Sequence, residues 1–198
     1  MRYAVPTIAI AAFALAPAIA LAHTGHGEPS GLVHGFIHPI AGIDHVLAMV
    51  AVGVLAAQLG GRAIWLVPLS FMVIMAVAGA LGMAGSQLPF AELGITLSVV
   101  VLGLAIAFPR KLLALAAIAL VGFFALFHGH VHGAEMPATA SALPYAAGFL
   151  GATALLHAVG VGLGLLFGLE GGKLGHRLVQ AGGSAMALFG ILVLAGLL

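Results

Sequence analysis

The chain has 198 residues, of which 63% are hydrophobic and 6% are charged, and its mean hydropathy is +1.27. A soluble domain has about 25% charged residues. Six Lys and Arg with five Asp and Glu cannot cover a surface in water, which excludes an ordinary cytosolic protein, a disordered segment and a nucleic-acid binder. Disulfides, thiolate metal sites and cysteine nucleophiles are excluded because there is no cysteine. Ten histidines in so poorly charged a chain need an explanation.

Residues 1–22 have the features of a secretory signal peptide. Arg2 provides a positive start, an apolar stretch follows, and Ala20-Leu21-Ala22 fits a cleavage site. Cleavage there would make His23 the first mature residue and leave 23–35 as a periplasmic, histidine-containing tail. The alternative is an uncleaved first membrane span, which the shortness of the apolar stretch disfavours.

The remainder, 36–198, is predicted to be an all-α integral membrane domain of about six transmembrane helices. Each apolar run is close to the roughly 20 residues that cross a bilayer, and the runs are continuous rather than alternating, which disfavours strands. The runs are 36–59, 63–85, 90–108, 111–128, 143–168 and 174–197.

The positive residues predict the orientation of this bundle. After the signal peptide, every Lys and Arg falls between runs one and two, three and four, or five and six: Arg62, Arg110, Lys111, Lys173 and Arg177. The alternate connections contain none, as expected when the cationic loops are cytoplasmic. Both mature termini are therefore predicted to be periplasmic, in the inner membrane of a Gram-negative bacterium.

Glycines in the fifth run predict close helix packing. Gly160, Gly164 and Gly168 lie four residues apart with Gly162 between them, and this spacing lets a neighbouring helix approach closely. A sliding or hinging helix is the functional alternative.

A first group of polar residues surrounds the start of the first span. Pro39 suits the first position of a helix, which would place His38 at its cap and His45 on the same face, about 10 Å deeper. One metal ion would reach both rings only if the chain bends near Pro39; otherwise they serve two sites along a path. Asp44 is expected to be a direct ligand or to orient an imidazole. A structural polar pair is the alternative, although ionisable residues inside a membrane are usually functional.

A second group follows the fourth span. If the helix continues, His128, His132 and Glu135 lie on one stripe and His130 points elsewhere. Two imidazoles and a carboxylate are a common ligand set for nickel, cobalt, zinc or copper. The two intervening glycines are expected to loosen the helix, and a solvated polar loop is the alternative.

The other histidines are less specific. His157 lies within the fifth span, where it is either a deep ligand or a satisfied core residue. His23 and His26 are candidates for capturing metal outside, or belong to a flexible tail, and His34 lies at the entrance to the first span. His176 is expected at the cytoplasmic interface.

Together these motifs resemble the HupE/UreJ family of nickel/cobalt permeases. The resemblance rests on His38-x5-Asp44-His45 and on Phe127-His128-Gly129-x-x-His132-Gly133-x-Glu135, and Leu155-Leu156-His157 also fits. It covers essentially the whole mature chain. It implies uptake of Ni²⁺, sometimes Co²⁺, and a role in metal passage for six residues: His38, Asp44, His45, His128, His132 and Glu135. The family pattern does not require the histidines at 23, 26, 34 and 130.

The sequence therefore predicts a permease for a divalent transition metal, in which histidines and carboxylates form a ligand path. Ni²⁺ is preferred to Co²⁺, and Cu²⁺ or Zn²⁺ are less favoured. The predicted partners are the ion and the lipid bilayer; no resident cofactor, nucleic acid or ATPase subunit is expected. Because a free imidazole has a pKa near 6.5, protonation below about pH 6 is expected to weaken uptake.

Three alternatives stay open at this level. An intramembrane zinc hydrolase would use three histidines and an aspartate to activate water. A membrane cytochrome would bind haem between paired histidines. A metal sensor or storage protein would bind the ion without transporting it.

Overall fold

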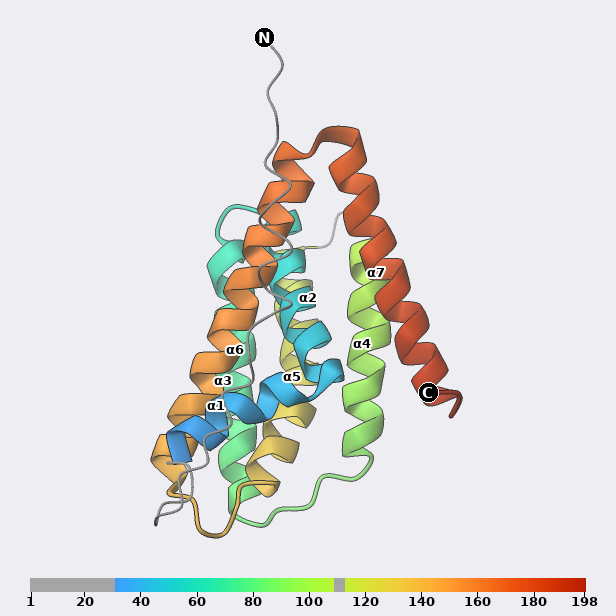
Figure 1. The fold of residues 1–198 in the computed structure, drawn as a ribbon. Helices are drawn as coiled ribbons and strands as arrows, with labels where there is room; N and C mark the ends of the chain where they lie inside the picture. Colours follow the sequence, from blue (N-terminus) through green and yellow to red (C-terminus); the bar gives the residue numbers. More distant parts are fainter. Residues whose placement is uncertain (1–30, 109–112) are drawn as a thin grey trace, which may run out of the picture.

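The computed structural model describes residues 31–108 and 113–198, and every regular element in these ranges is a helix (Figure 1). The predicted signal peptide, His23, His26, Arg110 and Lys111 lie outside these ranges. The helices are α1 (Gly31–Ala41), α2 (Ile43–Leu59), α3 (Ala63–Met83), α4 (Ala91–Ala107), α5 (Ala114–Ala134), α6 (Ala142–Leu165) and α7 (Gly172–Leu194), with a π-helical turn η2 (Leu166–Glu170) after α6.

The prediction of an all-α membrane protein is confirmed at the level of helix length and composition. Four helices, α3, α5, α6 with its π-helical extension, and α7, are long and apolar enough to cross a membrane, and α1 with α2 makes a fifth candidate if the pair is one span. The remaining apolar helix, α4, has 17 residues. Large apolar side chains on the outside of the bundle, such as Trp65 and Leu69, face outward, as expected for contact with lipid.

The expectation of one continuous first span beginning at Pro39 is wrong. Pro39 lies inside α1, three positions before the chain breaks, and α1 and α2 meet at an angle of 85°. The break is at Gly42, whose extended conformation (φ −90°, ψ 117°) makes it the N-cap of α2. In Figure 1, α1 lies obliquely across the lower part of the bundle, beside the last turns of α5. His38 and His45 therefore lie on different helices.

Glycines set the closest helix contacts, which pair α3 with α5, α2 with α6 and α4 with α7. At Gly53 of α2 a methyl group would overlap the carbonyl oxygen of His157, and at Gly160 of α6 it would overlap that of Val50. The predicted close approach along α6 is thus confirmed at Gly160 and at Gly164, where a methyl group would overlap the side chain of Ala57, but not at Gly168, where it would meet nothing within 4 Å. A methyl group at Gly162 would meet nothing within 4 Å.

The glycines of the second histidine group do not loosen their helix. α5 continues without a break to Ala134, because Gly129 and Gly133 pack against the backbone of α3, at Met75 and Gly79. The loop alternative for this group is wrong.

Candidate metal-binding site

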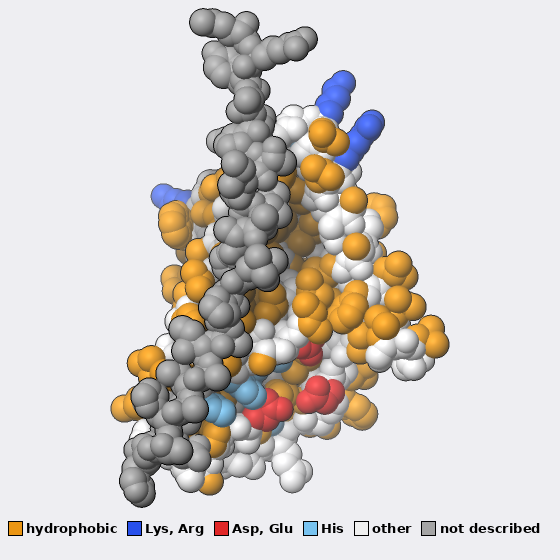
Figure 2. Space-filling view, viewed as in Figure 1, with side chains coloured by type: hydrophobic (Ala, Val, Ile, Leu, Met, Phe, Trp, Pro, Cys, Tyr) orange, Lys and Arg blue, Asp and Glu red, His pale blue; other side chains and the backbone are white. Residues whose placement is uncertain are grey.

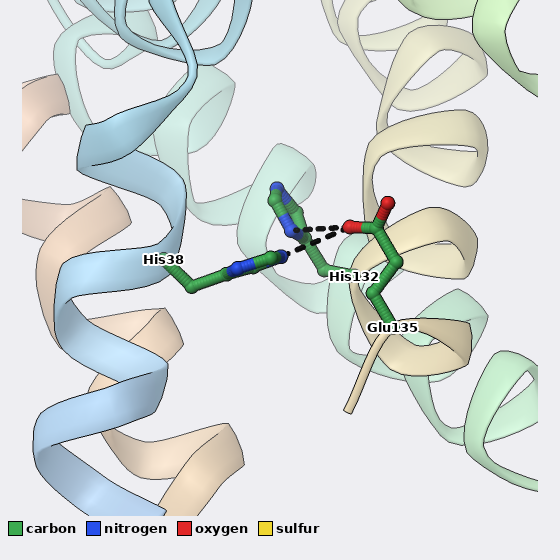
Figure 3. Close-up of side chains that lie close together, drawn as sticks. All are labelled: His38, His132 and Glu135. Carbon is green, nitrogen blue, oxygen red and sulfur yellow. Dashed lines mark hydrogen bonds and ion pairs between the residues drawn. The ribbon is translucent and has the colours of Figure 1, made fainter. Parts of the chain in front are cut away.

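The structure brings three ligand-type side chains together where α1 crosses the end of α5. His38 comes from α1, His132 from the last turn of α5, and Glu135 caps that helix. One ligand atom from each lies within 4.8 Å of the others. The three side chains converge in Figure 3. His38 Nε2 donates to Glu135 Oε2 at 2.9 Å, and His132 Nδ1 is 3.9 Å from the same oxygen.

The depth of these three side chains differs in a way that suits an entrance. Glu135 is about half exposed, at 49% of its side chain, His38 is 26% exposed and His132 is 4% exposed. A hydrated ion can therefore reach the carboxylate first and exchange its water for imidazole as it moves inward. Two imidazoles and a carboxylate match the ligand preference of divalent nickel, cobalt or zinc.

Asp44 orients His45 at the first turn of α2. Asp44 Oδ1 accepts the backbone N–H of His45 at 2.9 Å and lies 3.3 Å from His45 Nδ1. A carboxylate at a helix N-terminus is also stabilised by the helix dipole. Since an ionised carboxylate only accepts, His45 Nδ1 carries the hydrogen and Nε2 keeps a lone pair. His45 Nε2 is buried and has no hydrogen-bond partner among the described residues.

Ser98 of α4 fixes His128 in a corresponding way. The Ser98 hydroxyl donates its only hydrogen to the carbonyl of Ile95 at 2.6 Å, and Ser98 Oγ lies 2.8 Å from His128 Nε2. His128 Nε2 must therefore donate to Ser98, which leaves the lone pair on Nδ1. His128 Nδ1 is buried and finds no partner in the described part of the chain.

The four imidazoles form a continuous series from the exposed end into the bundle. Ring centroids are 4.8 Å apart between His38 and His132, 3.9 Å between His132 and His45, and 4.5 Å between His45 and His128. Both nitrogens of His132 are buried without a partner among the described residues. Because an unpaired buried polar group is costly, a water molecule or a metal ion bound to these nitrogens would stabilise them.

His157 lies beyond an aromatic ring. The Phe71 ring is 5.8 Å from His128 and 5.3 Å from His157, measured between centroids. His157 is 2% exposed, and neither of its nitrogens pairs with a described residue. The ring of Phe71 thus contacts both histidines, and His157 is not part of the contiguous imidazole series.

The remaining predicted histidines lie outside this series. His34 stacks on His38 with 6.0 Å between ring centroids. His130 points away, as expected: its Nε2 is 2.9 Å from the carbonyl of Ser86, in the connection between α3 and α4. His176 is at the opposite end of the bundle, on α7.

Three residues of the site were missed by sequence reasoning. Ser98 is the partner of His128, Tyr145 donates its hydroxyl hydrogen to the backbone carbonyl of His132 at 3.1 Å, and Phe71 contacts His128 and His157. The first two are polar residues in apolar runs, which was an available signal. Nothing distinguishes Phe71 in the sequence.

Comparison with known proteins agrees with this geometry. The family model described as HupE / UreJ protein matches residues 11–193. The chain is 47% identical over 197 residues to Protein HupE of Rhizobium leguminosarum bv. viciae, covering 99% of this chain and 100% of that relative. No solved structure matches. The resemblance inferred from the two histidine motifs is confirmed, and the chain belongs to the HupE/UreJ family of membrane proteins.

Proposed function

We propose that this protein is a permease that imports a divalent transition metal, Ni²⁺ by preference and Co²⁺ second. The observation that supports this most directly is the convergence of His38, His132 and Glu135 within 4.8 Å, continued inward by His45 and His128. Membership of the HupE/UreJ family supports the same conclusion, because this is a transporter family rather than an enzyme family and implies uptake of nickel and cobalt.

The ligand series supports a stepwise passage. Glu135 and His38 receive the ion, and His132 replaces part of its water shell. His45 Nε2 and His128 Nδ1 then take the ion further, because their other nitrogens are held by Asp44 and Ser98. Neutral imidazoles cost less to bury than carboxylates and bind nickel well. Hard ions such as Ca²⁺ and Mg²⁺ prefer oxygen ligands, so this series disfavours them.

His157 is the next station in this proposal. The ion has to pass Phe71 to reach it, since that ring contacts both His128 and His157. Rotation of the Phe71 side chain would then be part of transport. His23, His26 and His34 are proposed to collect the ion outside.

The distribution of charge favours six spans with both mature termini in the periplasm. Figure 2 shows Lys and Arg side chains at one end of the visible face, and acidic and histidine side chains at the other. The described cations are Arg62, Lys173 and Arg177. Cationic ends are usually cytoplasmic, so the His38 end would face the periplasm of a bacterial inner membrane.

Uptake of metal into proteoliposomes tests the proposal. Vesicles containing the full chain are loaded with a metal-sensitive dye and exposed to Ni²⁺, Co²⁺ or Cu²⁺, with and without a proton gradient. We expect uptake of Ni²⁺ and Co²⁺, and its loss in His45→Ala and Asp44→Ala. Thr96→Ala is the matched control, because this α4 hydroxyl bonds only its own helix, at the carbonyl of Glu92. Ni²⁺ uptake that is equal in wild type, His45→Ala and Asp44→Ala would show the mechanism to be wrong, and binding without uptake would favour a sensor or storage protein.

A further inference from the structure

A second group of polar side chains surrounds a cavity at the cationic end of the bundle. The cavity has a volume of about 120 Å³ and is lined by Gln58, His176 and Gln180, with Gly164 and Gly168 on the α6 side. Gln58 is the penultimate residue of α2, and the other two side chains come from the first half of α7. Neither the imidazole series nor Phe71 is part of this cavity, and Gly164 lies about 10 Å beyond His157 along α6.

His176 has the arrangement of a metal-ligating histidine. Its Nδ1 lies 2.9 Å from the carbonyl oxygen of Gly172. A carbonyl oxygen only accepts, so the neutral ring has its hydrogen on Nδ1 and a lone pair on Nε2. Histidine ligands in proteins are commonly fixed by such a bond to a backbone carbonyl.

The two glutamines can add oxygen ligands to this imidazole. Gln58 Nε2 donates to the carbonyl of Ile106 on α4 at 3.4 Å. This bond turns the amide nitrogen toward α4 and leaves Oε1 free to bind a cation. Gln180 lies four residues after His176, hence on the same face of α7. Gly168 leaves open space beside them, because a methyl group there would meet nothing within 4 Å.

We propose that Gln58, His176 and Gln180 form an inner site for the divalent metal ion, from which the ion leaves the protein. This inference rests on the proposed transport function. Its three ligands are neutral, whereas the outer site includes the Glu135 carboxylate. Arg177 and Lys173 are close on α7 and repel a cation. The inner site therefore binds the ion more weakly than the outer one, and an ion that has passed His157 is released instead of being held.

Chemical modification of His176 tests the inner site without measuring transport. The imidazole is exposed, so diethyl pyrocarbonate should modify it in the full chain in detergent, as followed by mass spectrometry of the peptide containing it. With Ni²⁺ at about twice the Kd of the inner site, the modification rate should fall about threefold, because the fraction of inner sites without Ni²⁺ is 1/(1 + [Ni²⁺]/Kd). Mg²⁺ at the same concentration should protect much less, since an imidazole is a poor ligand for it.

Substitution of the glutamines distinguishes this site from an indirect effect. Leucine suits a membrane helix, so Gln58→Leu with Gln180→Leu should fold, and it should abolish Ni²⁺ protection of His176. Ser184→Ala is the matched control, because this α7 hydroxyl bonds only the carbonyl of Gln180 and protection should persist. Absence of protection in the wild type, or protection that survives the double substitution, would overturn the inner site.

Uptake measurements separate the inner site from the proposed function itself. If the wild type takes up Ni²⁺ in proteoliposomes and His176→Ala takes it up more slowly with unchanged tight binding, both proposals stand. If the wild type transports and His176→Ala is equally fast, the inner site is wrong and the permease stands. If the wild type does not transport Ni²⁺, the permease is wrong, whatever the modification experiment shows.

Discussion

The substitution Ser98→Ala tests how the imidazole series is kept ready for metal. The Ser98 hydroxyl donates to Ile95, so His128 Nε2 must donate to Ser98 and His128 Nδ1 keeps its lone pair. Both side chains are fully buried, at 0% exposure. Alanine removes the acceptor and leaves His128 Nε2–H unpaired in the bundle.

The expected loss follows from that burial. Leaving one buried donor unpaired costs about 1–3 kcal/mol, and the ring escapes this cost by moving its hydrogen to Nδ1 or by rotating. Either change removes the Nδ1 lone pair from the path. Loss of a partner that orients a metal ligand typically weakens binding about 10–100-fold, which corresponds to about 1.4–2.8 kcal/mol. The two magnitudes agree, so Ser98→Ala should weaken Ni²⁺ binding and uptake by about that factor.

Calorimetric titration of the purified chain with Ni²⁺, together with proteoliposome uptake, measures this effect. Thr96→Ala, two residues away on α4, removes a hydroxyl that bonds only the carbonyl of Glu92 and should change neither quantity. Thermal unfolding of both variants checks that they fold. Binding and uptake within twofold of wild type in a folded Ser98→Ala protein would refute the argument that Ser98 selects the form of His128.

Three further substitutions address other parts of the molecule. Glu135→Gln should raise the Kd for Ni²⁺ about 30-fold, because one negative charge about 4 Å from a divalent ion contributes roughly 2 kcal/mol in a water-like dielectric, which suits this half-exposed carboxylate; calorimetry with an unchanged Kd would contradict its role. Gly53→Ala should destabilise the fold by about 1–3 kcal/mol through overlap with His157, seen as a lower Tm, whereas Gly162→Ala should not lower it. His130→Ala should leave Ni²⁺ uptake close to wild type, because His130 contacts the α3–α4 connection; loss of uptake in a folded variant would place it on the path.

The helices were predictable because each apolar run is continuous and bounded by polar residues. The break at Gly42 was not, since a glycine inside an apolar run is compatible with a straight membrane helix. What decides it is packing: at Gly35 of α1 a methyl group would overlap the backbone of Tyr145 on α6, so α1 is held across the bundle instead of continuing α2. The chain thus bends at Gly42, close to Pro39. A single metal ion could reach both His38 and His45 only with such a bend.

The candidate site could be predicted where its residues lie close together in the sequence, and could not where a partner comes from a distant helix. Helical spacing places His128 and His132 on one stripe, as the continuous α5 confirms. Ser98 stands out as a polar residue in an apolar run, but its partner could not be predicted, because a lone serine in a membrane helix often bonds only its own backbone, as Ser70 does with the carbonyl of Val67. Only the packing of α4 beside α5 shows that Ser98 also contacts His128.

The shortness of α4 has a consequence for the surrounding bilayer. This helix has 17 residues, a rise of about 26 Å, against a hydrocarbon core of roughly 30 Å, and Leu93, Leu97 and Leu104 are exposed on its outer surface. Hydrophobic mismatch of this kind draws the two lipid leaflets together, so the apolar barrier is thinner beside this helix. Ni²⁺ uptake should therefore depend on acyl-chain length, falling in proteoliposomes of long-chain lipids; equal rates in short-chain and long-chain vesicles would contradict this dependence.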